Sequence, residues 1–105
     1  MFAPRLRITP EAKQVLGERL ARSGLSDPRA TVLWASEGEF ESLEKAKANA
    51  RWCVAFYDGK TLFWFQKCKI EGLPFCFVQI GHRKRLNGAT LDWTNGKFQV
   101  SNSAT

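Results

Sequence analysis

Residues 86–102 read LNGATLDWTNGKFQVSN and contain two Asn-Gly pairs, Asn87-Gly88 and Asn95-Gly96. Both residues of such a pair tolerate a positive φ, so Asn-Gly between alternating apolar residues is the strongest short-range signal for a β-hairpin. The stretch therefore predicts two short strands, residues 89–93 and 97–101, bounded by tight turns.

The chain has 105 residues, of which 44% are hydrophobic and 12% aromatic. This composition predicts one globular domain over residues 1–105, with enough apolar surface to fill a core. No apolar run approaches the roughly 20 residues that a membrane span needs, and the N-terminus lacks the apolar core of a signal peptide. We therefore expect a cytoplasmic protein with no membrane association.

The formal net charge is +6, and the lysines and arginines are spread along the chain apart from one cluster, His82-Arg83-Lys84-Arg85. A net charge of this sign attracts anionic partners and says nothing about the fold. A basic run this short is more often a solvated loop than a nucleic-acid site. We interpret these four residues first as a solvated basic loop and second as a weak site for an anion or a partner.

Two elements are predicted before residue 25. Residues 4–8 alternate like an edge strand, with apolar side chains on one face and arginines on the other. Thr9 can cap a helix over residues 10–22, because its hydroxyl accepts from orphan N–H groups and Pro10 suits the first helical position. Gly24 fits the left-handed position that ends a helix.

The middle of the chain alternates between strand and helix character. Residues 30–35 and 51–57 have the composition of strands. Between them, residues 37–50 are rich in helix formers and poor in β-branched residues, which predicts a short helix or an ordered excursion between the two strands.

Asp58-Gly59 is a further hairpin signal, and it predicts a return strand over residues 60–68. The apolar side chains of this segment fall on both faces, so we expect a central strand that is covered on both sides. A further buried strand is predicted over residues 75–80.

Together these elements predict an α+β fold that is mainly β. We expect compact sandwich-like or barrel-like sheets with one N-terminal helix packed on them and a possible second short helix within residues 37–50. The four tryptophans are expected in the core, because most of them lie in strands that are apolar on both faces.

Motifs at the two ends of the chain carry a family resemblance. The helix start Ile8-Thr9-Pro10-Glu11-Ala12, the later LNGATLDW and the following GKFQVSN resemble motifs of the HesB/IscA family, the A-type iron-sulfur biogenesis proteins. The resemblance implies a HesB-like fold for the whole chain. The resemblance also implies structural roles for the matched positions, which are Thr9, Gly88, Leu91, Asp92, Gly96, Phe98 and Asn102.

The resemblance also shows what this chain lacks. The family binds iron or an iron-sulfur cluster through three cysteines, one in a loop after the second strand and two in a later Cys-Gly-Cys. Here that loop reads ASEGE over residues 35–39, and the chain reaches Thr105 without a Cys-Gly-Cys. No cluster ligand can therefore be carried over, and we expect no cofactor.

The cysteines that the chain does have are Cys53, Cys68 and Cys76, an odd number without close pairs. This argues against a disulfide framework and a conventional zinc site. All three lie in apolar strand contexts, so we predict structural roles, with metal binding as the weak alternative. Cys68, between two lysines, is the best candidate for a lowered pKa.

No catalytic residues are predicted. The chain has no nucleophile elbow, Walker loop or dinucleotide fingerprint, and its one histidine, His82, has no evident partner. Glu37, Glu39 and Glu41 are interpreted first as a solvated helix start and second as a site for a hard cation. Asp92 is interpreted as a structural residue that hydrogen-bonds within a turn. We therefore expect a protein that is not an enzyme.

Three functional hypotheses remain open at this point. The first, which we favour, is a HesB/IscA-like scaffold without a cluster site that binds a protein or a small ligand. The second is an iron-sulfur or iron carrier that uses the noncognate cysteines. The third, disfavoured, is a nucleic-acid-binding module that uses residues 83–85 and exposed aromatics such as Trp52 or Trp64. A protein partner is expected, and a homo-oligomer remains possible.

Overall fold

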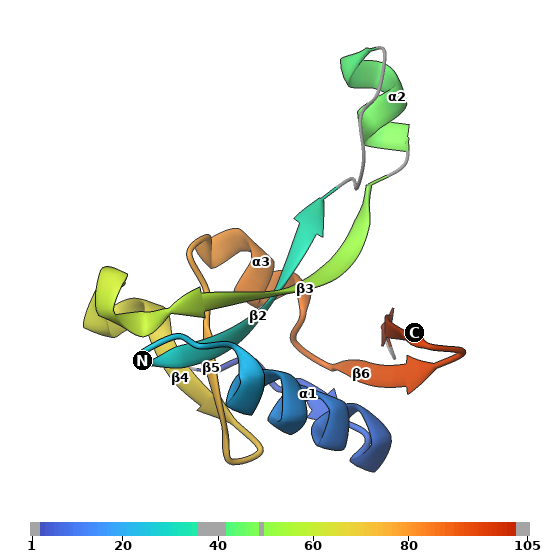
Figure 1. The fold of residues 1–105 in the computed structure, drawn as a ribbon. Helices are drawn as coiled ribbons and strands as arrows, with labels where there is room; N and C mark the ends of the chain where they lie inside the picture. The colour runs from blue at the N-terminus through green and yellow to red at the C-terminus, as the bar shows by residue number, and fades with distance from the viewer. Residues whose placement is uncertain (1–2, 36–41, 49, 103–105) are drawn as a thin grey trace.

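The computed structural model describes residues 3–35, 42–48 and 50–102. It shows an α+β fold that is mainly β, as predicted, with its strands in two sheets (Figure 1). In chain order the elements are β1 (Arg7–Ile8), α1 (Pro10–Arg22), β2 (Pro28–Ala35), α2 (Leu43–Ala48), β3 (Arg51–Asp58), the 3-10 turns η1 (Gly59–Thr61) and η2 (Trp64–Gln66), β4 (Lys67–Ile70), β5 (Leu73–Cys76), α3 (Ile80–Arg85), β6 (Ala89–Thr94) and β7 (Lys97–Asn102).

The strand order is β1-β6-β7 in the smaller sheet and β3-β2-β5-β4 in the larger one. Helix α1 contacts β6 of the first sheet and β2 of the second, so it joins the two sheets through one core. The predicted N-terminal helix packed on the sheets is therefore confirmed, with the predicted bounds. β3 and β7 are each the last strand of their sheet, and they approach each other.

The turn at Asn95-Gly96 is the predicted hairpin. Asn95 has φ 55° and Gly96 has φ 78°, and Thr94 pairs directly with Lys97 across the two-residue loop. Positive φ at both central residues matches the right-handed twist of the flanking strands, which is why Asn-Gly is favoured there.

Asn87-Gly88 does not join two strands, which corrects the prediction of a second tight hairpin. It links α3 to β6, and the N–H of Gly88 (φ 87°) donates to the carbonyl oxygen of Arg5 at 2.9 Å. The dipeptide specifies a local backbone conformation, whereas the element that precedes it depends on the rest of the chain.

The two ends of the chain are held together along β1 and β6. These strands pair in parallel, with Arg7 opposite Thr90 and Ile8 opposite Leu91. The N–H of Thr9 continues the contact by donating to the carbonyl oxygen of Leu91 at 3.0 Å. The predicted edge strand is thus confirmed, although only two of its residues form ladder pairs.

One hydrophobic core fills the space between α1 and the two sheets. It collects residues from α1 and from strands of both sheets, which is expected of a small domain with a single core. Its buried members are Leu6, Ile8, Ala12, Leu16, Leu20, Ala30, Val32, Ile70, Phe75, Phe77, Leu86, Ala89 and Leu91.

The predicted return strand over residues 60–68 is wrong. Among the described residues, β3 pairs with β2 alone, and the chain then runs through η1 and η2 before β4 joins the opposite edge of the larger sheet. The carboxylate of Asp58 accepts from the N–H groups of Lys60 and Asp27. These contacts stabilise a 3-10 turn in place of a hairpin, because a capping carboxylate satisfies N–H groups that a strand ladder would otherwise use.

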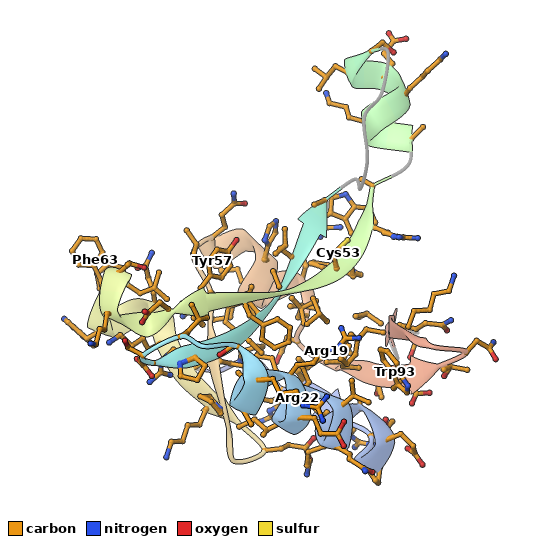
Figure 2. All side chains as sticks on the ribbon, in the orientation of Figure 1. Arg19, Arg22, Cys53, Tyr57, Phe63 and Trp93 are labelled. Carbon is orange, nitrogen blue, oxygen red and sulfur yellow. The ribbon has the colours of Figure 1, made fainter. Side chains whose placement is uncertain are left out.

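Three aromatic side chains that were expected inside the sheet are therefore exposed. The exposed fractions are 67% for Phe63, 77% for Trp64 and 43% for Phe65. Figure 2 shows Phe63 at an end of the molecule remote from Trp93. We call residues 63–65 the aromatic tip. The expectation that the tryptophans lie in the core is also wrong, since Trp34 is exposed and Trp52 and Trp93 are only half-buried.

Two further differences concern the segment after β5. The predicted buried strand ends early, because β5 stops at Cys76 and helix α3 begins at Ile80. The segment predicted as a basic loop is this helix. A helix does form within the 37–50 excursion, as α2, which projects beyond the ends of β2 and β3 (Figure 1). Positions 37–41 and 49, with the acidic cluster, lie outside the described residues.

Candidate functional site: a basic and aromatic groove

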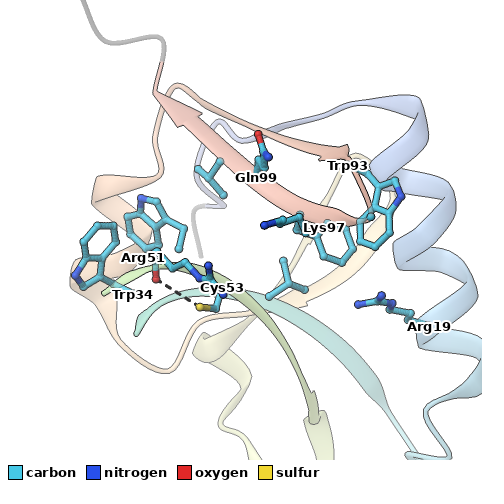
Figure 3. Close-up of a pocket in the computed structure, with 12 residues that line it drawn as sticks. Arg19, Trp34, Arg51, Cys53, Trp93, Lys97 and Gln99 are labelled. Carbon is cyan, nitrogen blue, oxygen red and sulfur yellow. Dashed lines mark hydrogen bonds between the residues drawn. The ribbon is translucent and has the colours of Figure 1, made fainter. Parts of the chain in front are cut away.

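A cavity of about 600 Å³ lies between the edge strands β3 and β7 (Figure 3). Residues 51–54 of β3 form one wall, and residues 96–100 of the hairpin turn and β7 form the other. Arg19 of α1, Trp34 of β2 and Trp93 of β6 complete the lining. We call this cavity the β3–β7 groove. It was not predicted, because it exists only where the edges of two separate sheets meet.

A tryptophan pair forms one end of the groove, and an arginine packs against this pair. Trp34 and Trp52 are directly opposite each other in the β2–β3 ladder, and their rings meet edge to face with centroids 5.2 Å apart. The guanidinium carbon of Arg85, on α3, is 4.7 Å from both ring centroids. Cation–π contacts of this kind hold a charged group against an apolar surface. Helix α3 thus brings a cation to the tryptophan pair, although Arg85 itself is not one of the residues that line the groove.

A second arginine packs on aromatic rings at the other end. Trp93 and Phe98 are cross-strand partners in the β6–β7 hairpin, with ring centroids 4.7 Å apart. The guanidinium carbon of Arg19 lies 5.1 Å from the Trp93 centroid and 5.2 Å from the Phe98 centroid. An aromatic pair thus packs against a guanidinium at each end of the groove, but only Arg19 of these two arginines lines the cavity.

The charges along the groove are of one sign. Arg19, Arg51 and Lys97 are lining residues, whereas no aspartate or glutamate is found among the described residues that line it. Low-dielectric walls lined by one sign of charge concentrate the field in a cleft. The groove therefore favours an anionic ligand.

The basic cluster of residues 82–85 is divided by helix α3. His82 and Arg85 both contact Trp52, the histidine edge-on with centroids 5.8 Å apart. Arg83 instead lies near Cys68, where its charge favours the thiolate, and Lys84 is exposed. Burial, and then the charge of Arg85, lower the pKa of His82. The four residues thus do not form one binding patch.

The three cysteines are not disulfide-bonded, and they occupy different places. Cys53 lines the groove, and its Sγ lies 3.6 Å from the carbonyl oxygens of Ala35 and Arg51. Cys68 and Cys76 lie on the paired strands β4 and β5. Among the described residues, no three histidine, cysteine, aspartate or glutamate side chains are grouped as metal ligands would be.

The expectation of a lowered pKa for Cys68 is wrong. Burial raises the pKa of this thiol, and the opposing charges of Arg83 and Arg29 do not reverse that effect. Burial also raises the pKa of Cys76 to about 11, with smaller contributions from Cys68 and Asp27 in the same direction. The flanking lysines do not decide the shift, because a buried thiolate loses the solvation that water would supply.

We expect Cys76 to react with iodoacetamide at about pH 8 roughly 100-fold more slowly in the folded protein than in the denatured protein. A pKa of about 11 is two units above the usual 9.0, and each unit lowers the thiolate fraction tenfold. Timed alkylation followed by peptide mass spectrometry measures the rate. Equal rates in the folded and denatured protein would contradict the assignment of Cys76 as a buried thiol.

Thr9 and Asp92 connect the two motif segments. The Thr9 hydroxyl donates to Asp92 Oδ1 at 2.8 Å, and Thr9 Oγ1 also caps α1 by accepting from the N–H of Ala12 at 3.3 Å. Asp92 also accepts from the N–H of Trp93 and the hydroxyl of Thr94. The hydrogen bond from Thr9, then those from Trp93 and Thr94, lower the pKa of Asp92. The long-range bond to Thr9 was not foreseen from the sequence.

We expect Asp92→Asn to destabilise the protein near neutral pH, and the loss to shrink as the pH falls. A folded-state pKa below the unfolded value means that the carboxylate stabilises the fold above the unfolded pKa. This contribution disappears as the pH falls through the folded pKa. Urea unfolding of both proteins at about pH 7 and about pH 3 measures the difference. An equal loss at both values would contradict a role for the carboxylate charge.

Four further motif positions lie in the β6–β7 hairpin. Leu91 is buried in the core, Gly96 occupies the hairpin turn, and Phe98 packs on Trp93. Asn102 is the last residue of β7 and pairs with Ala89. These positions support the hairpin and its packing, and Phe98 also lines the groove.

No protein-family model and no curated protein matches this chain. Within the described residues, no helix is long and apolar enough to cross a bilayer.

Proposed function

We propose that this protein is a binding module on a HesB/IscA-like scaffold without the family's cluster site, and that the β3–β7 groove takes an anionic ligand with an apolar or aromatic part. One observation carries the proposal: the charged side chains that line the groove are cations, and they stand beside tryptophan and phenylalanine rings. The protein acts by binding, without catalysing a reaction.

Two observations support the scaffold part of the proposal. The motif segments around Thr9 and Asp92, 83 residues apart, meet through a direct hydrogen bond. The loop in which the family carries its first cysteine has none here. A scaffold that keeps its structural motif and lacks the cluster cysteine is suited to a different ligand.

The size and lining of the groove support the ligand part. A volume of about 600 Å³ falls within the usual range of small-ligand sites. Such sites combine apolar walls with a few placed polar groups that fix the orientation of the ligand. Here Trp34, Trp52 and Trp93 supply the walls, and Arg19 and Lys97 supply the charge.

Titration with anilinonaphthalene sulfonate, an anionic aromatic probe, tests this proposal by NMR of the indole N–H groups. We expect the signals of Trp34, Trp52 and Trp93 to shift and saturate together, because all three line the groove. Trp64, on the aromatic tip, serves as the internal control and should not follow the same curve. Shifts confined to Trp64, or shifts that do not saturate, would overturn the proposal.

A pair of charge reversals tests the electrostatic part. Lys97→Glu should weaken binding of the probe about fivefold or more, since reversing a nearby charge costs on the order of 1 kcal/mol. Lys69→Glu makes the same change on β4, at the opposite edge of the larger sheet, and should change affinity less than about twofold. Equal weakening by both variants would mean that only net charge matters, against a site in the groove.

A further inference from the structure

The β3–β7 groove lies between strand edges, and this restricts what can occupy it. We infer that its ligand is an extended acidic peptide segment that adds to β7 as a further strand. This inference rests on the proposed function and deepens it, because it names the chemical class of the ligand and the backbone atoms that bind it.

The first argument is the order of the lining residues. Side chains of a strand alternate between its two faces, so a cavity against one sheet face is lined by every second residue. Here residues 51–54 and 96–100 are consecutive. A cavity that contacts consecutive residues faces the edge of a strand, where the main-chain N–H and C=O groups point.

The second argument is the hydrogen-bond pattern of β7. In a two-residue hairpin the residues that flank the turn, Thr94 and Lys97, exchange both main-chain hydrogen bonds. The main-chain N–H and C=O groups of successive residues point to opposite edges of a strand. Those of Lys97 point toward β6, so those of Phe98 and Val100 point away from it. No strand in the described part of the chain pairs with this edge. An extended peptide can therefore bond to these two residues, as in β-strand addition.

The third argument is charge. The cations Arg19, Arg51 and Lys97 surround this edge, so a segment rich in aspartate or glutamate is complementary to it. The same charges oppose the pairing of two copies through β7, because each copy carries a net charge of +6. An acidic partner chain is thus favoured over a second copy.

A single strand of nucleic acid would also be anionic, but the ring contacts favour a peptide. Stacking of bases requires open aromatic faces. Arg85 already packs against both Trp34 and Trp52, and Arg19 against Trp93 and Phe98. A peptide needs no open ring face, because its main chain bonds to β7 and its carboxylates contact the cations.

The test uses peptides of about ten residues, the upper length of an ordinary strand. The first alternates glutamate and valine, and the second is the same peptide with every second amide nitrogen methylated. The third replaces glutamate with lysine. An oligothymidylate of similar length represents nucleic acid. Binding is followed by NMR of the labelled protein, together with hydrogen exchange of its amides.

We expect the glutamate peptide to bind, to compete with the anilinonaphthalene probe and to slow hydrogen exchange at the amides of Phe98 and Val100. N-methylation that removes the pairing donors should weaken binding at least about tenfold, because it removes the main-chain hydrogen bonds to the C=O groups of Phe98 and Val100. The lysine peptide should not bind. Because the changes are made in the peptide, the fold of the protein is unaffected.

Two results would overturn the inference while the proposed function stands. One is equal binding of the methylated and unmethylated glutamate peptides, which would show that strand pairing does not contribute. The other is probe binding in the groove that the oligothymidylate displaces and the glutamate peptide does not, which would identify nucleic acid as the ligand class. Failure of the probe itself to shift the groove tryptophans would instead refute the proposed function.

Discussion

Phe75→Ala is expected to lower the free energy of unfolding by about 3–5 kcal/mol, the usual cost of removing a large aromatic ring from a packed core. Phe75 has no exposed surface, and it stacks on Phe77 with ring centroids 6.4 Å apart. Its strand, β5, pairs with both β2 and β4. Since small domains are stable by only about 5–15 kcal/mol, urea unfolding should show a largely destabilised protein.

Trp64→Ala is the matched control, because it also removes a large aromatic ring. Trp64 is 77% exposed on the aromatic tip, so the expected loss is below about 0.5 kcal/mol. The sequence pattern alone predicted a central strand through this residue, and in such a strand the two substitutions would cost similar amounts. Comparable losses would therefore contradict the fold described here.

Arg29→Met is expected to cost about 2–4 kcal/mol, because hydrogen bonds from a charged donor contribute roughly 1.5–3 kcal/mol each and are only partly additive. The Nη1 of Arg29 donates to the carbonyl oxygens of Cys68 and Phe75, each at 3.2 Å. Its Nε donates to Asp27 Oδ2 at 3.2 Å. Only 18% of the Arg29 side chain is exposed. Its hydrogen bonds connect β2 to β4 and β5. Methionine keeps the apolar stem and removes these donors.

Gly59→Ala should disturb the contact between Asp27 and Arg29 by adding a methyl group next to it. A Cβ at Gly59 would lie 2.0 Å from Asp27 Oδ2 and 2.8 Å from Arg29 Nε, so the carboxylate must move away from the guanidinium. The losses from Arg29→Met and Gly59→Ala should therefore be less than additive in the double variant. Full additivity would contradict a shared network.

Gly17→Ala provides the control for the glycine substitution. Gly17 is in the interior of α1, and an added Cβ would meet no atom within 4 Å. Alanine is the better helix former by roughly 1 kcal/mol, so this variant should be more stable than the parent protein. Opposite signs at the two glycines, measured by urea unfolding, would show that the surroundings of each glycine determine the effect.

The groove could not be foreseen from the sequence, although two of its components were visible there. The pattern around Asn95-Gly96 predicted the hairpin that carries Trp93, Lys97 and Phe98. The basic cluster that contains Arg85 is visible in the sequence, but its position against Trp34 and Trp52 is not. A short basic run does not reveal which aromatic rings a helix will bring it to. The signal that could have indicated this surface is the combination of residues 83–85 with exposed aromatics such as Trp52, which we disfavoured from the sequence alone.

The sequence by itself determined the local elements whose causes are local. Thr9 and Pro10 start α1, Gly24 follows it with φ 73°, and Asn95-Gly96 closes the β6–β7 hairpin. Capping hydrogen bonds and permitted φ values act within a few residues, so they can be read from adjacent letters.

Tertiary structure alone decided the course of the chain after β3 and the position of the groove. The Asp58 carboxylate caps a turn by accepting from the N–H of Lys60, and it also accepts from the N–H groups of Ser26 and Asp27, about 30 residues away in sequence. These contacts replace the hairpin that Asp58-Gly59 would otherwise favour. β3 and β7 belong to different sheets, so their approach depends on how α1 joins both sheets through one core. Contacts between distant segments are set by packing of the whole chain, because alternation in one segment shows its faces and not its neighbours.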